Sequence, residues 1–179
     1  ALVDEWLTAL LGDESRCAIV AVGGYGREEL APKSDLDVLL LHDAPRQVKA
    51  IADRLWYPIW DAGFRLDHSV RTVRQAVDVS DADLKAMLGL LDARYVAGSG
   101  ELVHELNRRA LARWSGRLDR WMPVLVASLE ERHARAGPVA FALEPELKEG
   151  KGGLRDAAVV RALSRATSVV ELTPEVVSA

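Results

Sequence analysis

Two short runs close together in the chain decide the fold: Val-Gly-Gly-Tyr-Gly-Arg at residues 22–27 and Ser-Asp-Leu-Asp at residues 34–37. The first run ends an apolar stretch, residues 16–22, whose Val and Ile content predicts a buried strand. The second run opens residues 34–42, where alternation places apolar residues on one face and Asp35 and Asp37 on the other. The pattern predicts a groove beside a glycine turn, with two carboxylates facing it.

The paired carboxylates favour a metal site. Residues i and i+2 of a strand point to the same side about 7 Å apart, so Asp35 and Asp37 repel each other unless something compensates their charge. Mg²⁺ prefers hard oxygen ligands and keeps sites open for substrate phosphates. Two such ions about 3.5–4 Å apart stabilise the attacking and leaving oxygens in a displacement at phosphorus. We therefore predict two Mg²⁺ ions at Asp35 and Asp37.

The glycines upstream supply the other half of the predicted site. Gly23 and Gly24 follow a strand, and without a Cβ their backbone N–H groups can approach a triphosphate closely. Arg27 is within reach of the same phosphates, and Ser34 completes the predicted nucleotide-binding residues of this region. The third spaced glycine of a dinucleotide-binding fingerprint and the Gly-Lys-Ser/Thr of a Walker A loop are both missing from this run.

Each feature has an ordinary alternative when it is taken alone. A Gly-Gly pair after a strand is more often a simple turn. An Asp-x-Asp pair on a strand is more often a solvated surface pair. The combination is more specific than its parts, because strand, glycine pair, nine further residues and Ser-Asp-Leu-Asp follow one another in this order.

This order resembles the DNA polymerase β-like nucleotidyltransferase superfamily and, more closely, the bacterial PII-protein uridylyltransferases. Three segments carry the resemblance: residues 23–37, His-Ser-Val-Arg-Thr at 68–72, and Leu-Glu-Pro-Glu-Leu-Lys-Glu-Gly-Lys-Gly-Gly-Leu-Arg-Asp at 143–156. The resemblance implies transfer of UMP from UTP, or of AMP from ATP, to a tyrosine hydroxyl of the PII nitrogen-regulatory protein. Pyrophosphate is the second product.

The superfamily resemblance also implies a third carboxylate on a neighbouring strand. Asp67 is the candidate, because alternation from Leu66 turns it away from the buried face of a predicted strand at residues 64–71. An exposed surface charge is the alternative. His68 is more typical of a packed or hydrogen-bonded residue than of a catalytic base. We therefore assign proton abstraction to a carboxylate of the metal site.

The downstream segment is dense in glycine and charge. By itself it is typical of a solvated basic turn before a helix. The resemblance favours a nucleotide-contacting loop at residues 144–156, in which the flexible backbone of Gly152 and Gly153 and the cations of Lys148 and Arg155 contact phosphates or base.

Hydrophobic periodicity predicts the order of the elements. Helices are expected at residues 1–11, 25–30 and 45–62, and strands at 16–22, 34–42 and 64–71. From residue 73 to residue 135 nearly everything has helical spacing, with breaks near Ser80, Gly98 and Gly116. The fold class predicted is α+β: a polymerase β-type mixed sheet with flanking helices (palm-like domain, residues 1–79), then a mainly helical domain (residues 80–179).

Composition excludes several classes of protein. The 179 residues are 49% hydrophobic and 28% charged, typical of a globular chain. A net charge of −4 provides no basic field for nucleic acid. Cys17 is the single cysteine, so no internal disulfide forms, and no apolar run reaches the roughly 18–20 residues of a membrane helix. We expect a cytoplasmic protein that binds neither nucleic acid nor membrane.

The first residue is Ala rather than Met, which suggests a piece of a longer protein. By the resemblance, full-length members continue into a metal-dependent HD hydrolase domain and glutamine-sensing ACT domains. The sequence has no His-Asp pair of that kind, so we expect nucleotidyl transfer without nucleotidyl removal and without a glutamine response.

Two other functions stay open. Glutamine synthetase adenylyltransferases share the Gly-Gly, Asp-x-Asp and Gly-Gly-Leu/Ile-Arg elements, although the Tyr-Gly-Arg of residues 25–27 and the segment 68–72 favour the PII enzyme. A catalytically inactive nucleotide-binding regulatory module is the second alternative, and the presence of both Asp35 and Asp37 counts against it.

Overall fold

The computed structural model describes residues 2–30, 34–43, 46–136 and 147–166, and it has the predicted α+β class. By internal contacts the chain forms two compact units, Ala1–Ala110 and Leu111–Ala179. The functional boundary after residue 79 remains a prediction.

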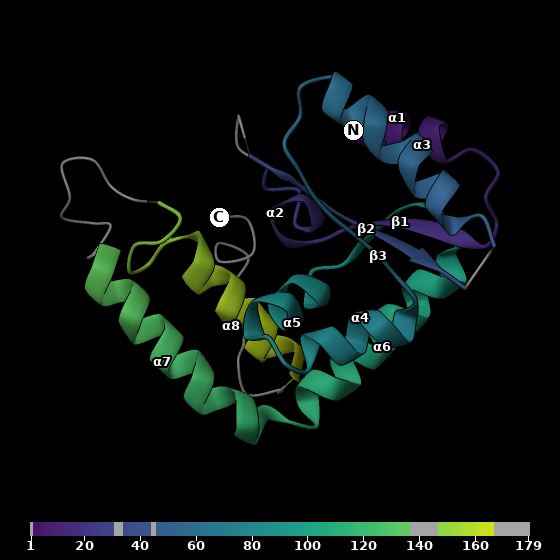
Figure 1. The fold of residues 1–179 in the computed structure, drawn as a ribbon. Coiled ribbons are helices and arrows are strands. Elements are labelled where there is room, and N and C mark those ends of the chain that lie inside the picture. The colour runs from purple at the N-terminus through teal and green to yellow at the C-terminus, as the bar shows by residue number, and fades with distance from the viewer. Residues whose placement is uncertain (1, 31–33, 44–45, 137–146, 167–179) are drawn as a thin grey trace. The chain divides into compact units, whose positions relative to one another are not determined.

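A four-stranded mixed sheet forms the centre of the first unit (Figure 1). Its strands are β1 (Cys17–Ala21), β2 (Leu36–His42), β3 (Leu66–Arg71) and β4 (Arg94–Gly98), in the spatial order β3-β2-β1-β4. β1 runs antiparallel to both of its neighbours, and β2 and β3 are parallel. The two central strands are buried almost throughout, which explains why their sequences are nearly continuous apolar runs.

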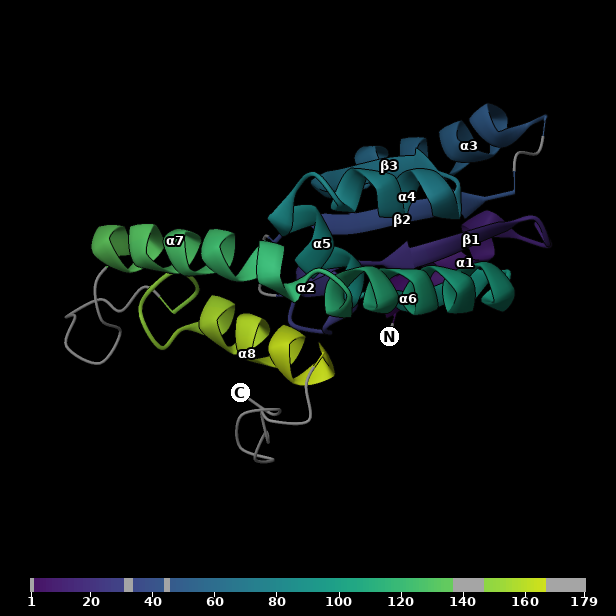
Figure 2. The same ribbon diagram turned by 90° about the horizontal axis from the view of Figure 1, so that it is seen from below.

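Helices cover both faces of this sheet (Figures 1 and 2). α1 (Leu2–Leu11) and α3 (Val48–Asp61) pack on the face that contains Leu36, Val38 and Leu40. The other face, with Leu39 and Leu41, packs against three helices: α4 (Val73–Ser80), α5 (Leu84–Leu91) and the first part of α6 (Gly100–Ser115). The alternation in β2 assigns Asp37 to this second face.

The strand β4 corrects the expectation that the segments between the breaks after residue 73 are all helical. It is only five residues long and joins α5 directly to α6. A bulge opposite Ile19 and Val20 also breaks its alternation, because Val96 is an extra residue and both Val96 and Ala97 are buried. A short strand without a two-residue period gives no signal in a periodicity analysis. Gly98, expected as a helix break, has φ 86° and lies against the carbonyl of Cys17.

The short helix predicted over residues 25–30 is also misplaced. The helical turn α2 is Gly23–Gly26, so the glycines themselves form it rather than precede it. Glu28 has φ 63°, a left-handed conformation that a right-handed helix cannot continue through. The chain therefore leaves the turn after four residues.

The second unit contains α7 (Leu118–Ala136) and α8 (Leu154–Ala166). Trp114, fully buried, donates its indole N–H to the carbonyl of Ala162 at 2.8 Å and packs against Trp121 at a ring distance of 6.3 Å. α8 begins directly after Gly152 and Gly153. None of the helices in the described ranges is long and apolar enough to cross a membrane.

Candidate active site

The glycine turn and Asp37 are in direct contact. Gly23 has φ 55°, and a Cβ added to it would lie 2.8 Å from Oδ2 of Asp37. The backbone N–H of Val22 donates to the carbonyl of Asp37 at 3.0 Å, which fixes the end of β1 beside the start of β2. Gly24 has more room: a Cβ there would meet only the Glu29 carbonyl at 3.9 Å and the Arg27 side chain at 4.0 Å.

Asp37 and Asp67 are partners across the parallel strands β2 and β3. Residues in register on neighbouring strands project to the same face of a sheet, so both carboxylates lie on the face covered by α4, α5 and α6. Asp37 is half-buried and Asp67 is exposed. The structure thus places Asp67 where alternation predicted it, on the strand next to Asp37. Its role as a metal ligand remains a prediction.

Asp35 lies just before β2 rather than in it, and Ser34 precedes it half-buried. The Asp35 side chain is 53% exposed and forms an ion pair with Arg65 at 2.8 Å. Among the residues that the structure describes, no group of three His, Cys, Asp or Glu side chains is arranged to hold a metal ion. Asp37 and Asp67 therefore come together, while Asp35 is engaged elsewhere.

Arg27 is bound within the protein. Its side chain, 20% exposed, donates to Glu29 at 2.6 Å and to Asp92 at 2.7 Å. Burial lowers the pKa of Arg27, but these two carboxylates outweigh burial and the net pKa is raised. Arg27 thus ties the glycine turn to the segment between α5 and β4, and its predicted contact with phosphates remains a prediction.

A second network on the turn was not found by sequence analysis. The Tyr25 hydroxyl donates to Asp4 at 2.5 Å, and Arg94 donates to both oxygens of Asp4 at 2.9 and 3.2 Å. Burial and the bond to Asp4 raise the pKa of Tyr25 well above its usual range. Burial also raises the pKa of Asp4, but the bonds from Arg94 and Tyr25 outweigh it, and the net pKa is lowered. Tyr25 and Arg94 are 21 and 90 positions from Asp4 in the sequence, so no local pattern connects the three residues.

His68 contacts aromatic side chains, as expected for a packed residue, but it is exposed. Its ring lies 5.0 Å from that of Trp56 and 5.4 Å from that of Trp60, both in α3. Alternation in β3 places it on the opposite face from Asp67. His68 therefore points away from the carboxylates.

In the second unit, Asp156 organises the glycine loop. Its carboxylate accepts the Gly152 N–H at 2.8 Å, contacts His133 Nε2 at 2.9 Å, and pairs with Arg132. Burial raises the pKa of Asp156, but these three partners outweigh it and the net pKa is lowered. Asp156 thus fixes the loop to α7, a role that sequence analysis assigned neither to it nor to His133.

The residues of this loop that were predicted to contact the nucleotide also make close contacts within the protein itself. Arg155 donates to Glu149 at 2.6 Å. A Cβ on Gly153 would lie 2.5 Å from the carbonyl of Leu147, so tight folding alone requires glycine there. Leu143 to Glu146 of the predicted segment lie outside the described residues. The joint action of this loop with Asp37 remains a prediction.

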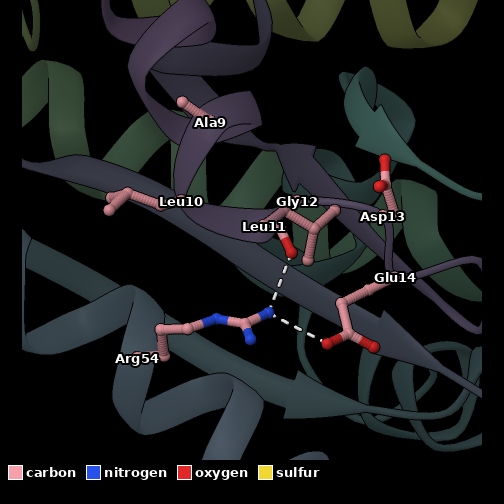
Figure 3. Close-up of a pocket in the computed structure, with 7 residues that line it drawn as sticks. All are labelled: Ala9, Leu10, Leu11, Gly12, Asp13, Glu14 and Arg54. Carbon is pink, nitrogen blue, oxygen red and sulfur yellow. Dashed lines mark hydrogen bonds and ion pairs between the residues drawn. The ribbon is translucent and has the colours of Figure 1, made fainter.

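A surface hollow of about 370 Å³ lies at the end of α1, lined by Leu11, Glu14 and Arg54 among others (Figure 3). Arg54 crosses it to donate to the Leu11 carbonyl at 2.8 Å and to Glu14 at 3.0 Å. An arginine that binds the last carbonyls of a helix is a helix-capping residue. The hollow contains none of the predicted site residues.

Comparisons with known proteins agree with this geometry. Residues 4–84 match the nucleotidyltransferase domain family model. Strands β1, β2 and β3, the glycine turn and the carboxylate pair thus lie in a nucleotidyltransferase domain, while β4 follows the matched range. Residues 120–179 match the GlnD PII-uridylyltransferase model. The chain belongs to the PII-uridylyltransferase family.

Curated relatives support the same family. The chain is 50% identical over 169 residues to a bifunctional uridylyltransferase/uridylyl-removing enzyme of Streptomyces coelicolor, covering 91% of this chain and 20% of the relative. The chain is 47% identical to the enzyme of the same name from Mycobacterium tuberculosis H37Rv, over 92% of this chain and 21% of the relative. The chain spans about a fifth of the length of these relatives. A solved toxin–antitoxin structure with AMP-PNP has a TM-score of only 0.45 at 12% identity, covering 69% of this chain and 97% of that one.

Proposed function

We propose that this chain transfers UMP from UTP to a tyrosine hydroxyl of a PII signal-transduction protein and releases pyrophosphate. The observation that carries the proposal is the contact of Gly23 with Asp37, with Asp67 in register beside it. The relatives' name and the family model's description favour a uridylyl group and a PII acceptor. ATP as donor is the alternative that the experiment below distinguishes.

The carboxylates fit a hard divalent cation. Asp37 and Asp67 offer oxygen ligands on one face of neighbouring strands. Asp35 joins them in this proposal by leaving Arg65, a change of low cost because both members of that pair are more than half exposed. When bound, two Mg²⁺ ions would offset the charge of the triphosphate and of the transition state.

The remaining chemistry belongs to the chain's own groups. The acceptor hydroxyl forms a bond to the α-phosphorus as the bond to pyrophosphate breaks, and a site carboxylate takes the hydroxyl proton. Gly23, Gly24 and Ser34 hold the triphosphate through backbone and hydroxyl groups. The first N–H groups of a helical turn have no partner within the turn, so those at Gly23 and Gly24 suit this role.

The second unit contributes contacts to the nucleotide in this proposal. Lys148 and Arg155 would pair with phosphate oxygens, with Gly152 and Gly153 allowing close approach. For Arg155 this requires release from Glu149, and that ion pair is about 40% exposed on both sides (42% and 37%). Pairs of this exposure contribute little to stability, so exchange for a phosphate is feasible.

The test is incubation with PII protein, Mg²⁺ and α-labelled UTP or ATP. We expect label on PII from UTP. Asp37→Ala should lower the rate about 10³-fold, since loss of a metal ligand removes several kcal/mol of transition-state stabilisation. Circular dichroism and thermal unfolding check that the variant is folded.

Asp61→Ala is the matched control, because Asp61 is an exposed carboxylate at the last position of α3. Its transfer rate should equal that of the wild type. Full transfer by Asp37→Ala would overturn the assignment. Label on glutamine synthetase, in a parallel incubation where it replaces PII, would support the adenylyltransferase alternative, and label from ATP alone would change the donor.

A further inference from the structure

The glycine turn is held from outside by residues of two distant elements. Asp4 of α1 accepts the Tyr25 hydroxyl at 2.5 Å. Arg94, the first residue of β4, donates to the Tyr25 carbonyl at 3.4 Å, and its guanidinium lies over the Tyr25 ring, 5.3 Å from the centroid. Three different contacts on one residue leave the turn little freedom to move.

We propose that Asp4 and Arg94 are positioning residues for the nucleotide site, which act through Tyr25 to hold the glycine turn against Asp37. This inference rests on the proposed function, because it assumes that the turn binds the triphosphate. It adds two residues that belong to none of the three sequence segments of the family resemblance.

The network is strong enough for this role. Asp4 and Arg94 have side chains that are only 20% and 26% exposed, and Arg94 binds both oxygens of Asp4. Bidentate Arg–carboxylate pairs fix orientation as well as distance. Tyr25 is 3% exposed, so its ring cannot shift without disturbing the core around it.

The turn transmits this constraint to the carboxylate. Gly26 N–H donates to the Val22 carbonyl at 3.0 Å, and Arg27 N–H donates to the Gly23 carbonyl at 3.1 Å. These bonds make residues 22–27 one rigid segment, with Tyr25 at its centre. Movement of Tyr25 therefore displaces Gly23, whose α-carbon contacts Asp37. Displacements of about 1 Å at a reacting centre can cost about 10²-fold in rate.

The test uses two variants of the whole 179-residue chain. Tyr25→Phe removes only the hydroxyl and keeps the buried ring, and Asp4→Asn removes the charge that Arg94 binds. In both we expect faster amide hydrogen exchange at Gly26 and Arg27. We also expect the KM for UTP to rise about tenfold, the effect of roughly one weakened hydrogen-bonding contact.

KM separates positioning from simple loss of stability. A partly unfolded population lowers the amount of active protein and hence the apparent kcat, but it leaves KM unchanged. Arg54→Ala is the matched control, because Arg54 binds the other end of α1 through the Leu11 carbonyl and Glu14. The Arg54→Ala variant should have the same amide hydrogen exchange at Gly26 and Arg27, and the same KM for UTP, as the wild type.

Unchanged exchange and KM in Tyr25→Phe and Asp4→Asn would overturn the inference, as would equal changes in Arg54→Ala. The exchange measurement needs no turnover. A wild-type protein without transfer would therefore overturn the proposed function. Even then, faster amide exchange in the two variants would support the conclusion that the Asp4–Tyr25 contact holds the turn in place.

Discussion

The α-carbon of Gly23 lies against the carboxylate of Asp37, and a Cβ built on Gly23 would be 2.8 Å from Asp37 Oδ2. The backbone at Gly23 also has φ 55°, a left-handed conformation that side chains disfavour. Two independent constraints therefore disfavour any residue other than glycine. The turn and the carboxylate are fitted to each other, so changes in one should appear in the function of the other.

Gly23→Ala should impair transfer more than stability. We expect a loss of about 1–2 kcal/mol in unfolding free energy from the left-handed backbone. Asp37 must also rotate away from the new methyl group, so kcat/KM should fall by at least about 10²-fold. Urea unfolding and PII labelling measure the two effects. Transfer at the wild-type rate would show that the observed Asp37 orientation is not the one used.

Gly24→Ala should leave stability almost unchanged and weaken nucleotide binding. A Cβ at Gly24 would find only ordinary contacts at 3.9 and 4.0 Å, so the protein itself does not require glycine there. Stability should stay within about 0.5 kcal/mol of the wild type. If the turn admits a triphosphate, the added methyl group should raise the KM for UTP several-fold. An unchanged KM would remove Gly24 from the binding site.

Local patterns predict the parts of the structure that depend on burial. The two-residue period of a strand assigns Leu36 and Val38 to one face of β2 and Asp37 to the other, and it separates Leu66 from Asp67 in β3 in the same way. These patterns place both carboxylates correctly. His68 lies on the opposite face of β3, where it contacts Trp56 although it is exposed.

The contacts between distant residues could not be predicted in this way. Tyr25 meets Asp4 and Arg94 only because β4 pairs with β1, and β4 itself is too short and too irregular to be recognised. The ion pair of Asp35 with Arg65 arises in the same manner, from the approach of two strand ends. Sequence spacing carries no information about such pairings.

Asp67→Asn tests the third carboxylate. Because Asp67 is in register with Asp37, loss of its charge should weaken the apparent affinity for Mg²⁺. We expect the transfer rate to fall about 10²-fold and its midpoint in a Mg²⁺ titration to move to higher concentration. Asp78→Asn, an exposed carboxylate of α4, is the control. An unchanged rate and midpoint would identify Asp67 as a surface charge.

Gly26→Ala should destabilise the fold. A Cβ there would lie 2.2 Å from the carbonyl oxygen of Asp92 and 2.9 Å from that of Ala21, and backbone atoms cannot yield easily. A loss of about 2–4 kcal/mol is expected, within the range for overpacked buried sites. Gly89→Ala in α5 is the matched control: a Cβ there has nothing within 4 Å, so helix propensity should stabilise it by about 0.5–1 kcal/mol.

Asp156 should contribute stability that depends on pH. Burial raises the pKa of Asp156, but the Gly152 N–H, His133 and Arg132 outweigh it, so the folded-state pKa lies below the ordinary value of an aspartate. A carboxyl with a lowered folded pKa stabilises the protein above its unfolded pKa, and this contribution is lost as pH falls through the folded value. Asp156→Asn should therefore cost about 1–3 kcal/mol at pH 7, the range for bonds to a charged group.

The difference between wild type and Asp156→Asn should shrink as the pH falls below about 4, the region in which an unperturbed aspartate titrates. Urea unfolding at several pH values between about 7 and 3 measures it. Above that region the carboxylate is ionised in both folded and unfolded states, so the difference should be constant there. A difference that stays constant down to the lowest pH would mean that the charge of Asp156 does not stabilise the loop, and that shape alone fixes Gly152 beside α7.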